Sequence, residues 1–159
     1  MYVYKKPLEL LSEYGLKAED ITDVIVTHFH PDHIGCLHEF KHADICIQKY
    51  EYEGQKEFFT PDYRVFTFEK EYAFSSDIRI EHIGGHTKGS SVVFAGKFLL
   101  CSDEAYYYRN LTEKVRVNNC YSKESSQAFV EKYSRSEWTT LVYHDGGIMP
   151  NKVGFHEII

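Results

Sequence analysis

One stretch of the sequence, Thr27-His28-Phe29-His30-Pro31-Asp32-His33, constrains the fold more than any other. It follows the apolar run Val-Ile-Val at 24–26, which is typical of a buried strand. Because residues two apart in an extended chain point to the same face, we expect His28 and His30 to project together. Pro31 disfavours the helical conformation at His30 and donates no hydrogen bond, so the strand should end here and the chain should turn.

The side chains around this turn are those of a metal site. Asp32 and His33 add a carboxylate and an imidazole to His28 and His30, and these ligand types suit zinc and other first-row divalent ions. A lone histidine would more often be a solvated loop residue, but the repeated spacing argues against that interpretation. One tetrahedral ion does not need this many ligands from a single loop, so the stretch predicts two metal ions.

Composition limits the class of protein. The chain has 159 residues, of which 43% are hydrophobic and 16% aromatic, which suits one globular domain spanning 1–159. The net charge is -6 at pH 7 and the sequence pI is about 5.8. Nucleic-acid-binding proteins usually present a basic face, so we expect no nucleic-acid partner.

The cysteines and the apolar runs bear on localisation. The four cysteines show no C-x-x-C spacing, and we expect free thiols in a reducing compartment. The segment Met1 to Leu11 has no long apolar region, and no apolar run approaches the length of a membrane span. The sequence therefore predicts a soluble, cytoplasmic protein without a membrane partner.

Hydrophobic periodicity and turn residues predict alternating helices and strands, which is an α/β chain. Helices are expected over 7–14, after Gly35 through Phe40, over 48–56 and over 125–133. Strands are expected over 24–26, 44–47, 65–68, 78–83, 92–94, 98–100 and 141–143, with a hairpin turn at Gly96.

Three further ligand-type residues follow predicted strands. His86 comes after the glycine pair 84–85, which permits a sharp turn, while Asp103 and His144 follow the strands near 98–102 and 141–143. Taken singly, each has a structural explanation, because Asp103 could cap a turn and His144 could be an ordinary loop histidine. Their order along the chain is what makes them metal-ligand candidates.

The T-H-x-H-x-D-H-x-G pattern from Thr27 to Gly35 resembles the signature of the metallo-β-lactamase-fold hydrolases. In that fold, a histidine, an aspartate and a second histidine come later in the chain, each directly after a strand. His86, Asp103 and His144 have this order here. The resemblance implies a four-layer αββα sandwich of two similar halves. Only 27 residues precede His28, so we expect most of the N-terminal strands to be missing.

The resemblance also implies a ligand set. His28, His30 and His86 would bind one metal ion, Asp32, His33 and His144 the other, and Asp103 would bridge them. Zinc is the expected metal, with manganese, iron and cobalt as alternatives. The implied activity is that of a dinuclear metal-dependent hydrolase, which uses a metal-bridging hydroxide on a small-molecule ester, lactone or thioester. Asp32 would also be catalytic, because it would orient that hydroxide.

Tyr106 extends the resemblance towards one branch of the family. Its position in the sequence Asp103-Glu104-Ala105-Tyr106 is similar to that of a tyrosine in the N-acyl homoserine lactone lactonases, where the hydroxyl would stabilise an oxyanion. The chain contains 13 tyrosines, and the neighbouring positions 107 and 108 are tyrosines too, so chance is the competing explanation.

A second function class stays open at this stage. A sheet without its outer strands leaves an unpaired edge, which a partner or a second copy tends to cover. The alternative is therefore a metal-binding but catalytically weak domain that acts within a homo-oligomer or a larger assembly. For either function we expect self-association, most simply as a dimer.

Overall fold

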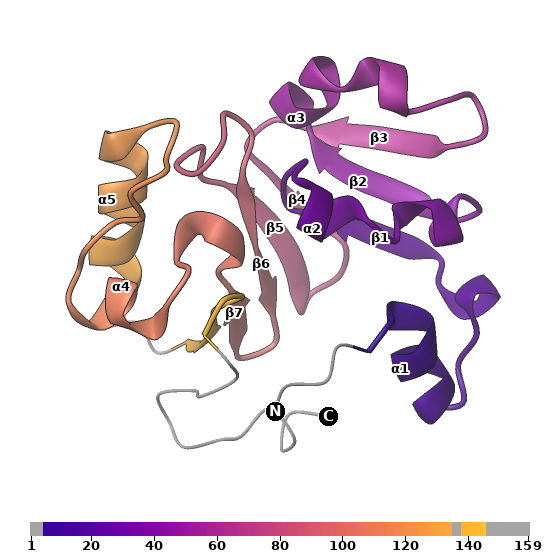
Figure 1. Cartoon of the computed structure of the whole chain (residues 1–159), viewed down its shortest axis with the longest axis horizontal. Coiled ribbons are helices and arrows are strands. Elements are labelled where there is room, and N and C mark those ends of the chain that lie inside the picture. The colour runs from indigo at the N-terminus through magenta and orange to yellow at the C-terminus, as the bar shows by residue number, and fades with distance from the viewer. Residues whose placement is uncertain (1–4, 135–137, 146–159) are drawn as a thin grey trace. The chain divides into compact units, whose positions relative to one another are not determined.

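The computed structural model describes residues 5–134 and 138–145 (Figure 1). The chain forms two compact units, residues 1–68 and 69–159, each with its own sheet and its own apolar core. Among the described residues, no helix combines the length and the apolar character needed to cross a membrane.

The first unit is built on a three-stranded parallel sheet in the order β1-β2-β3. The strands are β1 (Asp23–Val26), β2 (Asp44–Gln48) and β3 (Arg64–Phe68). Strand β2 lies in the centre and is almost entirely buried, as expected for a continuous apolar run in a parallel sheet. Its Ile45 and Ile47 form one core cluster with Val26 and Leu37.

Short helical segments connect these strands. They are α1 (Pro7–Glu13), η1 (Ala18–Asp20), α2 (Pro31–Ile34), η2 (Leu37–Phe40), α3 (Lys49–Gly54) and η3 (Lys56–Phe58). Pro7 occupies the first turn of α1, where a missing N–H costs nothing, and Gly15 follows the helix with a φ of 71°. The predicted helix over 7–14 is confirmed.

The second unit contains a five-stranded sheet in the order β4-β5-β6-β7-β8. Its strands are β4 (Glu71–Ala73), β5 (Ile78–His82), β6 (Ser91–Ala95), β7 (Phe98–Leu100) and β8 (Thr139–Leu141). The pairing is antiparallel except between β7 and β8. Gly96, with a φ of 55°, closes the predicted hairpin between β6 and β7.

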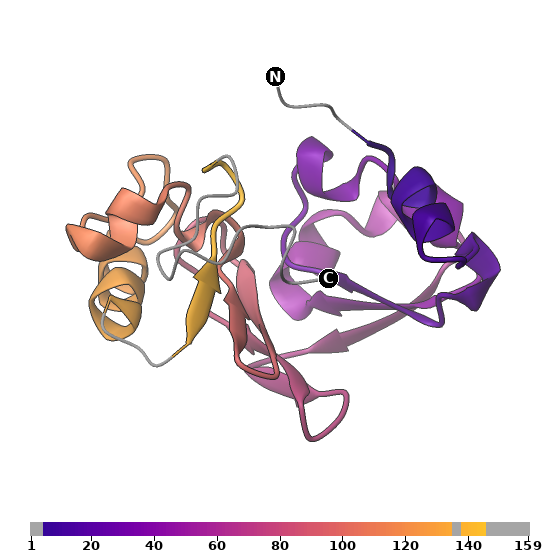
Figure 2. The ribbon, with the colours of Figure 1, turned by 90° about the horizontal axis from the view of Figure 1, so that it is seen from below.

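Two helices, α4 (Tyr108–Thr112) and α5 (Lys123–Tyr133), lie beside each other next to this sheet (Figures 1 and 2). Leu111 of α4 and Phe129 of α5 share one core cluster with Val92 and Leu99 of the sheet. The η4 turn (Ser102–Glu104) follows β7 and is buried. This packing fixes the segment between β7 and α4, which carries Asp103.

The remaining predicted elements are confirmed to within a few residues. The short segments η1, α2, η3 and η4 were not predicted, and three larger differences concern β4, α4 and the last strand. β4 was not predicted, because it is exposed along its whole length and shows no apolar alternation. α4 was not predicted either, because it begins in a run of tyrosines that favours strands, and Asn110 is what caps it by accepting the Tyr107 N–H. The last strand ends at Leu141, so the predicted strand over 141–143 is wrong by about two residues.

Candidate metal-binding site

The ligand candidates of the first unit, His28, His30, Asp32 and His33, all lie in residues 28–33, here called the histidine loop. His28 is fully buried just beyond the end of β1. Its Nε2 lies 3.0 Å from Nδ1 of His30, and its ring centroid lies 4.1 Å from that of His33. The structure thus gathers three imidazoles at one strand end.

The proline determines how this loop turns. His30 is extended, with φ -103° and ψ 151°, as a residue before proline prefers, and Pro31 then opens the short helix α2. The His33 N–H donates to the His30 carbonyl at 2.9 Å. Asp32 stands in the first turn with its side chain half exposed, and its Oδ2 lies 3.9 Å from Nε2 of His33.

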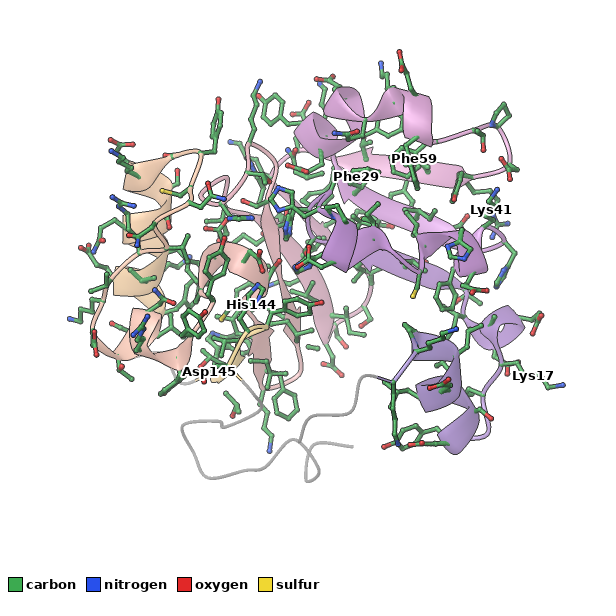
Figure 3. The ribbon with its side chains drawn as sticks, viewed as in Figure 1. Lys17, Phe29, Lys41, Phe59, His144 and Asp145 are labelled. Atoms are coloured by element: carbon green, nitrogen blue, oxygen red, sulfur yellow. The ribbon has the colours of Figure 1, made fainter. Side chains whose placement is uncertain are left out.

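Phe29, which lies between His28 and His30 in the chain, packs in an aromatic cluster. Its ring lies 4.9 Å from that of Phe58 and 5.6 Å from that of Phe59, and Figure 3 shows Phe29 and Phe59 close together. Its backbone N–H donates to Oε2 of the buried Glu51 at 2.8 Å. The aromatic cluster and the Glu51 carboxylate therefore both contact the histidine loop at Phe29.

The second unit gathers His86, Asp103 and His144 from three separate segments, here called the three-segment group. His86 Nε2 lies 3.4 Å from one Asp103 carboxylate oxygen, and His144 Nε2 lies 3.4 Å from the other. His86 and Asp103 are buried, whereas the His144 side chain is about one-third exposed. The aspartate thus lies between the two imidazoles.

Tyr106 closes this group. Its hydroxyl lies 3.3 Å from His86 Nδ1, and its ring centroid lies 4.9 Å from that of His144, a residue that Figure 3 labels. The backbone links the same residues, because the His144 N–H donates to the Tyr106 carbonyl at 3.1 Å. His86 Nδ1 also lies 3.1 Å from the Asn119 carbonyl, a contact that fixes the ring and directs Nε2 towards Asp103.

A buried carboxyl group, that of Glu104, supports the backbone at His86. Its Oε1 accepts the N–H groups of Gly85 and His86, both at 3.1 Å, and the hydroxyl of Ser90. Burial raises the pKa of the Glu104 carboxyl, although these hydrogen bonds lower it in part. Neither Glu104 nor Glu51 was predicted from the sequence. Only the position of Glu104, directly after a ligand candidate, could have indicated it.

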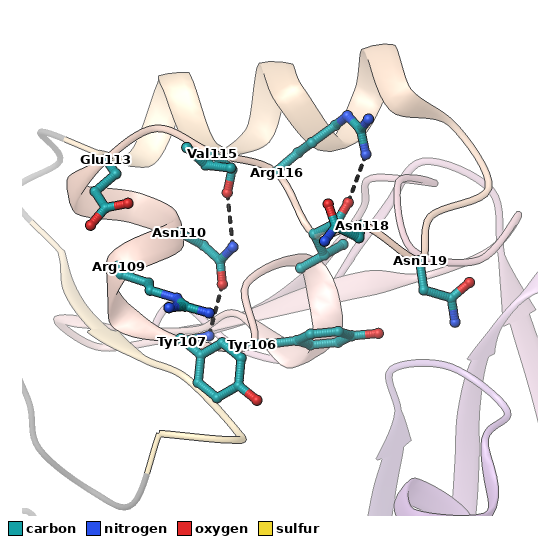
Figure 4. A pocket seen from close by; sticks show the side chains of 10 residues that line it. Tyr106, Tyr107, Arg109, Asn110, Glu113, Val115, Arg116, Asn118 and Asn119 are labelled. Atoms are coloured by element: carbon teal, nitrogen blue, oxygen red, sulfur yellow. Dashed lines mark hydrogen bonds between the residues drawn. The ribbon is translucent and has the colours of Figure 1, made fainter.

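An open pocket of about 310 Å³ lies beside Tyr106 within the second unit (Figure 4). Its wall includes Tyr107, Arg109 and Arg116 as well as Tyr106. Asn110 shapes this wall, because its amide accepts the Tyr107 N–H and donates to the Val115 carbonyl (Figure 4). The candidate oxyanion donor thus has space next to it for a small molecule.

The donor chemistry of both groups fits divalent metal ions. In the first unit, one ligand atom of His28 lies within 4.8 Å of one of His30. In the second unit, the same holds for His86 and Asp103. Imidazole nitrogens with carboxylate oxygens are the ligands that zinc binds in hydrolytic sites. The histidine loop and the three-segment group are therefore both suited to hold such ions.

Comparison with known proteins agrees with this chemistry. The family model of the metallo-beta-lactamase superfamily matches residues 4–112, well over half of the chain. The chain belongs to the metallo-beta-lactamase superfamily. This membership confirms the family that the T-H-x-H-x-D-H-x-G pattern suggested.

Lactonases are prominent among the superfamily members that resemble the chain. An N-acyl homoserine lactonase of a Bacillus species is 28% identical over 120 residues, which are 68% of this chain and 48% of the relative. That of Bacillus cereus is 28% identical over 118 residues, 67% of this chain and 47% of the relative. The chain thus spans about half the length of the curated relatives it matches.

Solved structures show the same fold. A quorum-quenching N-acyl homoserine lactone lactonase superposes with a TM-score of 0.77 at 22% identity, covering 94% of this chain and 68% of that one. A dizinc quorum-quenching lactonase, solved with its product, gives a TM-score of 0.70 at 18% identity, covering 87% of this chain and 62% of that one. The α/β metallo-β-lactamase-like fold is therefore confirmed, and it corresponds to only part of these larger structures.

Proposed function

We propose that this protein is a dinuclear metal-dependent hydrolase that acts on lactones or on related esters and thioesters. The observation that carries the proposal is the Asp103 carboxylate, which lies buried between His86 and His144 with one oxygen towards each. A carboxylate in this position can share its two oxygens between two ions.

The proposed ligand assignment uses all seven predicted residues. His28, His30 and His86 would hold one ion, Asp32, His33 and His144 would hold the other, and Asp103 would be shared by both. Superfamily membership and a dizinc relative of the same fold support this assignment. Zinc is the proposed metal, since imidazole and carboxylate ligands suit it.

Bound divalent ions would supply Lewis acidity and lower the pKa of a water molecule, so that hydroxide becomes available near neutral pH. Two side chains of the protein would supply proton transfer and stabilisation of the oxyanion. Asp32, with its half-exposed carboxylate, would accept a proton and orient the nucleophile. Tyr106, whose hydroxyl lies at His86, would donate a hydrogen bond to the oxyanion that develops on the substrate carbonyl.

A lactone is the preferred substrate class. The relatives that match most of the chain are named N-acyl homoserine lactonases, and the product N-hexanoyl-L-homoserine is bound at the catalytic metal centre of one structural neighbour. The pocket beside Tyr106 offers about 310 Å³ for such a molecule. We also propose a reducing, cytoplasmic location, which the free cysteines of the described chain support.

Metal content per chain, measured by elemental analysis together with the mass in solution, is the first test. About two ions per chain, and hydrolysis of an N-acyl homoserine lactone that a chelator abolishes and zinc restores, would support the proposal. Tight metal binding in a dimer with no turnover would favour the second function class, a catalytically weak domain within an assembly.

A further inference from the structure

We propose that Glu104 is a positioning residue, which fixes His86 relative to Asp103. It binds the backbone N–H of His86, and it is the next residue in the chain after Asp103. This inference rests on the proposed function, since it assigns a role in building that metal site. Glu104 follows Asp103 directly in the η4 turn. Its carboxyl group reaches the segment 84–90, which carries His86.

The contacts of Glu104 form a clamp on the glycine turn before His86. Oε1 accepts the N–H groups of Gly85 and His86, each at 3.1 Å. The Ser90 hydroxyl donates to the same oxygen, and the Thr87 N–H donates to Ser90 Oγ at 3.1 Å. Two consecutive N–H groups of a tight turn, which need acceptors once they are buried, are thus bound by one carboxyl oxygen.

The glycine at position 85 is matched to this carboxyl group. A Cβ atom at Gly85 would lie 2.1 Å from Glu104 Oε2 and 3.0 Å from the Cα of Ser126. The first separation is far below van der Waals contact, so a larger residue would displace the carboxyl group. The position of the Glu104 carboxyl group therefore requires a glycine at position 85.

The burial of Glu104 argues against a role in packing alone. The residue is completely buried beside the buried apolar residues Cys101 and Ala105. Burying a carboxyl group in such surroundings costs free energy that an apolar side chain would not cost. The hydrogen bonds to Gly85, His86 and Ser90 offset that cost, and all of them act on the segment that carries a ligand candidate.

Amide hydrogen exchange of the metal-free protein tests the clamp itself. In Glu104→Ala, the Gly85 and His86 amides should exchange at least about tenfold faster, because they lose their acceptor. Glu104→Gln, whose side-chain carbonyl can accept the same bonds, should restore most of the protection. Glu81→Ala is the matched control, since Glu81 lies in the same unit but forms its ion pairs with Arg79 and Lys132.

Cobalt(II) binding tests the consequence for the metal site. Glu104→Ala should weaken the binding of cobalt about 10- to 100-fold and shift its visible absorption bands, whereas Glu104→Gln should retain the wild-type bands. If Glu104→Ala does not fold, Ser90→Ala provides the milder change and should raise the exchange of the same two amides by a smaller factor.

Unchanged amide exchange in a folded Glu104→Ala or Ser90→Ala variant would overturn the clamp. Faster exchange with unchanged cobalt affinity and absorption bands would overturn the positioning role. Failure of the wild-type protein to bind cobalt would count against the proposed function instead, and the exchange data would still decide whether Glu104 holds the turn.

Discussion

In the histidine loop all four ligand candidates come from six consecutive residues, whereas the three-segment group draws on positions 86, 103 and 144. The geometry of the loop has a local cause, because Pro31 favours the extended conformation of His30 and begins the helix that carries Asp32 and His33. No local rule can place His86, Asp103 and His144 together. Their arrangement depends on strands, turns and helices that are distant in sequence.

Each group is supported by the carboxyl group of a buried glutamate. Glu51 supports the histidine loop by accepting the backbone N–H of Phe29, which lies between two histidines. Glu104 accepts two N–H groups and one hydroxyl at the His86 turn. In both groups, a buried glutamate thus holds the backbone next to a ligand candidate. Substitutions at equivalent points in the two units test the comparison.

The largest difference is expected between the two aspartates. Asp103→Asn should lower the metal content towards one ion per chain and reduce kcat/KM by more than about 100-fold, the upper end of what outer-shell partners contribute. Asp32→Asn, at a half-exposed position, should keep most of the metal but lose about 10²–10⁴-fold in kcat, as expected for a proton acceptor.

Elemental analysis and lactone hydrolysis measure both effects, with Asp77→Asn as an exposed control in the second unit. Equal loss of metal in the two variants would contradict the distinction between a shared ligand and a catalytic aspartate. Full activity in Asp32→Asn would remove Asp32 from the proposed mechanism.

The two glutamates should differ in stability. Glu104→Ala removes the acceptor of the Gly85 and His86 N–H groups, while the Ser90 hydroxyl keeps the Thr87 carbonyl, and it should lower the free energy of unfolding by about 2–3 kcal/mol, at roughly 1 kcal/mol per bond. Glu51→Ala removes the acceptor of the Phe29 N–H and should cost about 1–2 kcal/mol. Urea denaturation of the metal-free variants measures the difference. A larger loss in Glu51→Ala would reverse the proposed ranking of the supports.

Two glycines provide a smaller contrast. Gly85→Ala places a Cβ against Glu104 and Ser126, so it should destabilise the protein by about 1–3 kcal/mol. A Cβ atom at Gly54, at the end of α3, would meet open space, and this glycine has no positive φ. Gly54→Ala should therefore be neutral or stabilising by up to about 1 kcal/mol. Thermal unfolding compares them, and equal midpoints would show that the Gly85 contact relaxes freely.

The same contrast explains what the sequence could predict. The histidine loop was predictable because His28, His30, Pro31 and the preceding apolar run obey local rules of strand, turn and ligand spacing. The strands β2, β6 and β7 follow from apolar patterns that the buried sheets confirm. Asp103 and His144 gained weight only from the order of ligands in a related fold.

Other features had no local signal at all. β4 is an exposed edge strand, so the hydrophobic effect leaves no pattern in its sequence. Glu51 and Glu104 look like ordinary surface acids in a sequence that is 26% charged. Their roles depend on backbone N–H groups brought to them by other segments, and such contacts exist only after tertiary packing.

The smallest effect concerns the thiols. Each unit contains one buried and one partly buried cysteine. Cys46 and Cys101 are fully buried, whereas Cys36 and Cys120 are only partly buried. Burial raises the pKa of Cys46 to about 12, and it raises that of Cys101 as well. Since the thiolate is the reactive form, the native protein at pH 8 should be alkylated at Cys36 and Cys120 but not at the buried pair.

Mass spectrometry after brief treatment with iodoacetamide measures this labelling, with urea-unfolded protein as the control in which all four cysteines react. The raised pKa values also set the direction of the alkaline response. Above the ordinary thiol pKa of about 9, the unfolded chain loses these protons while the folded chain keeps them, so stability should fall as the pH rises from about 9 towards 12. Faster labelling of Cys101 than of Cys46 would show that the second unit opens more readily, despite the hydrogen bonds that Glu104 accepts.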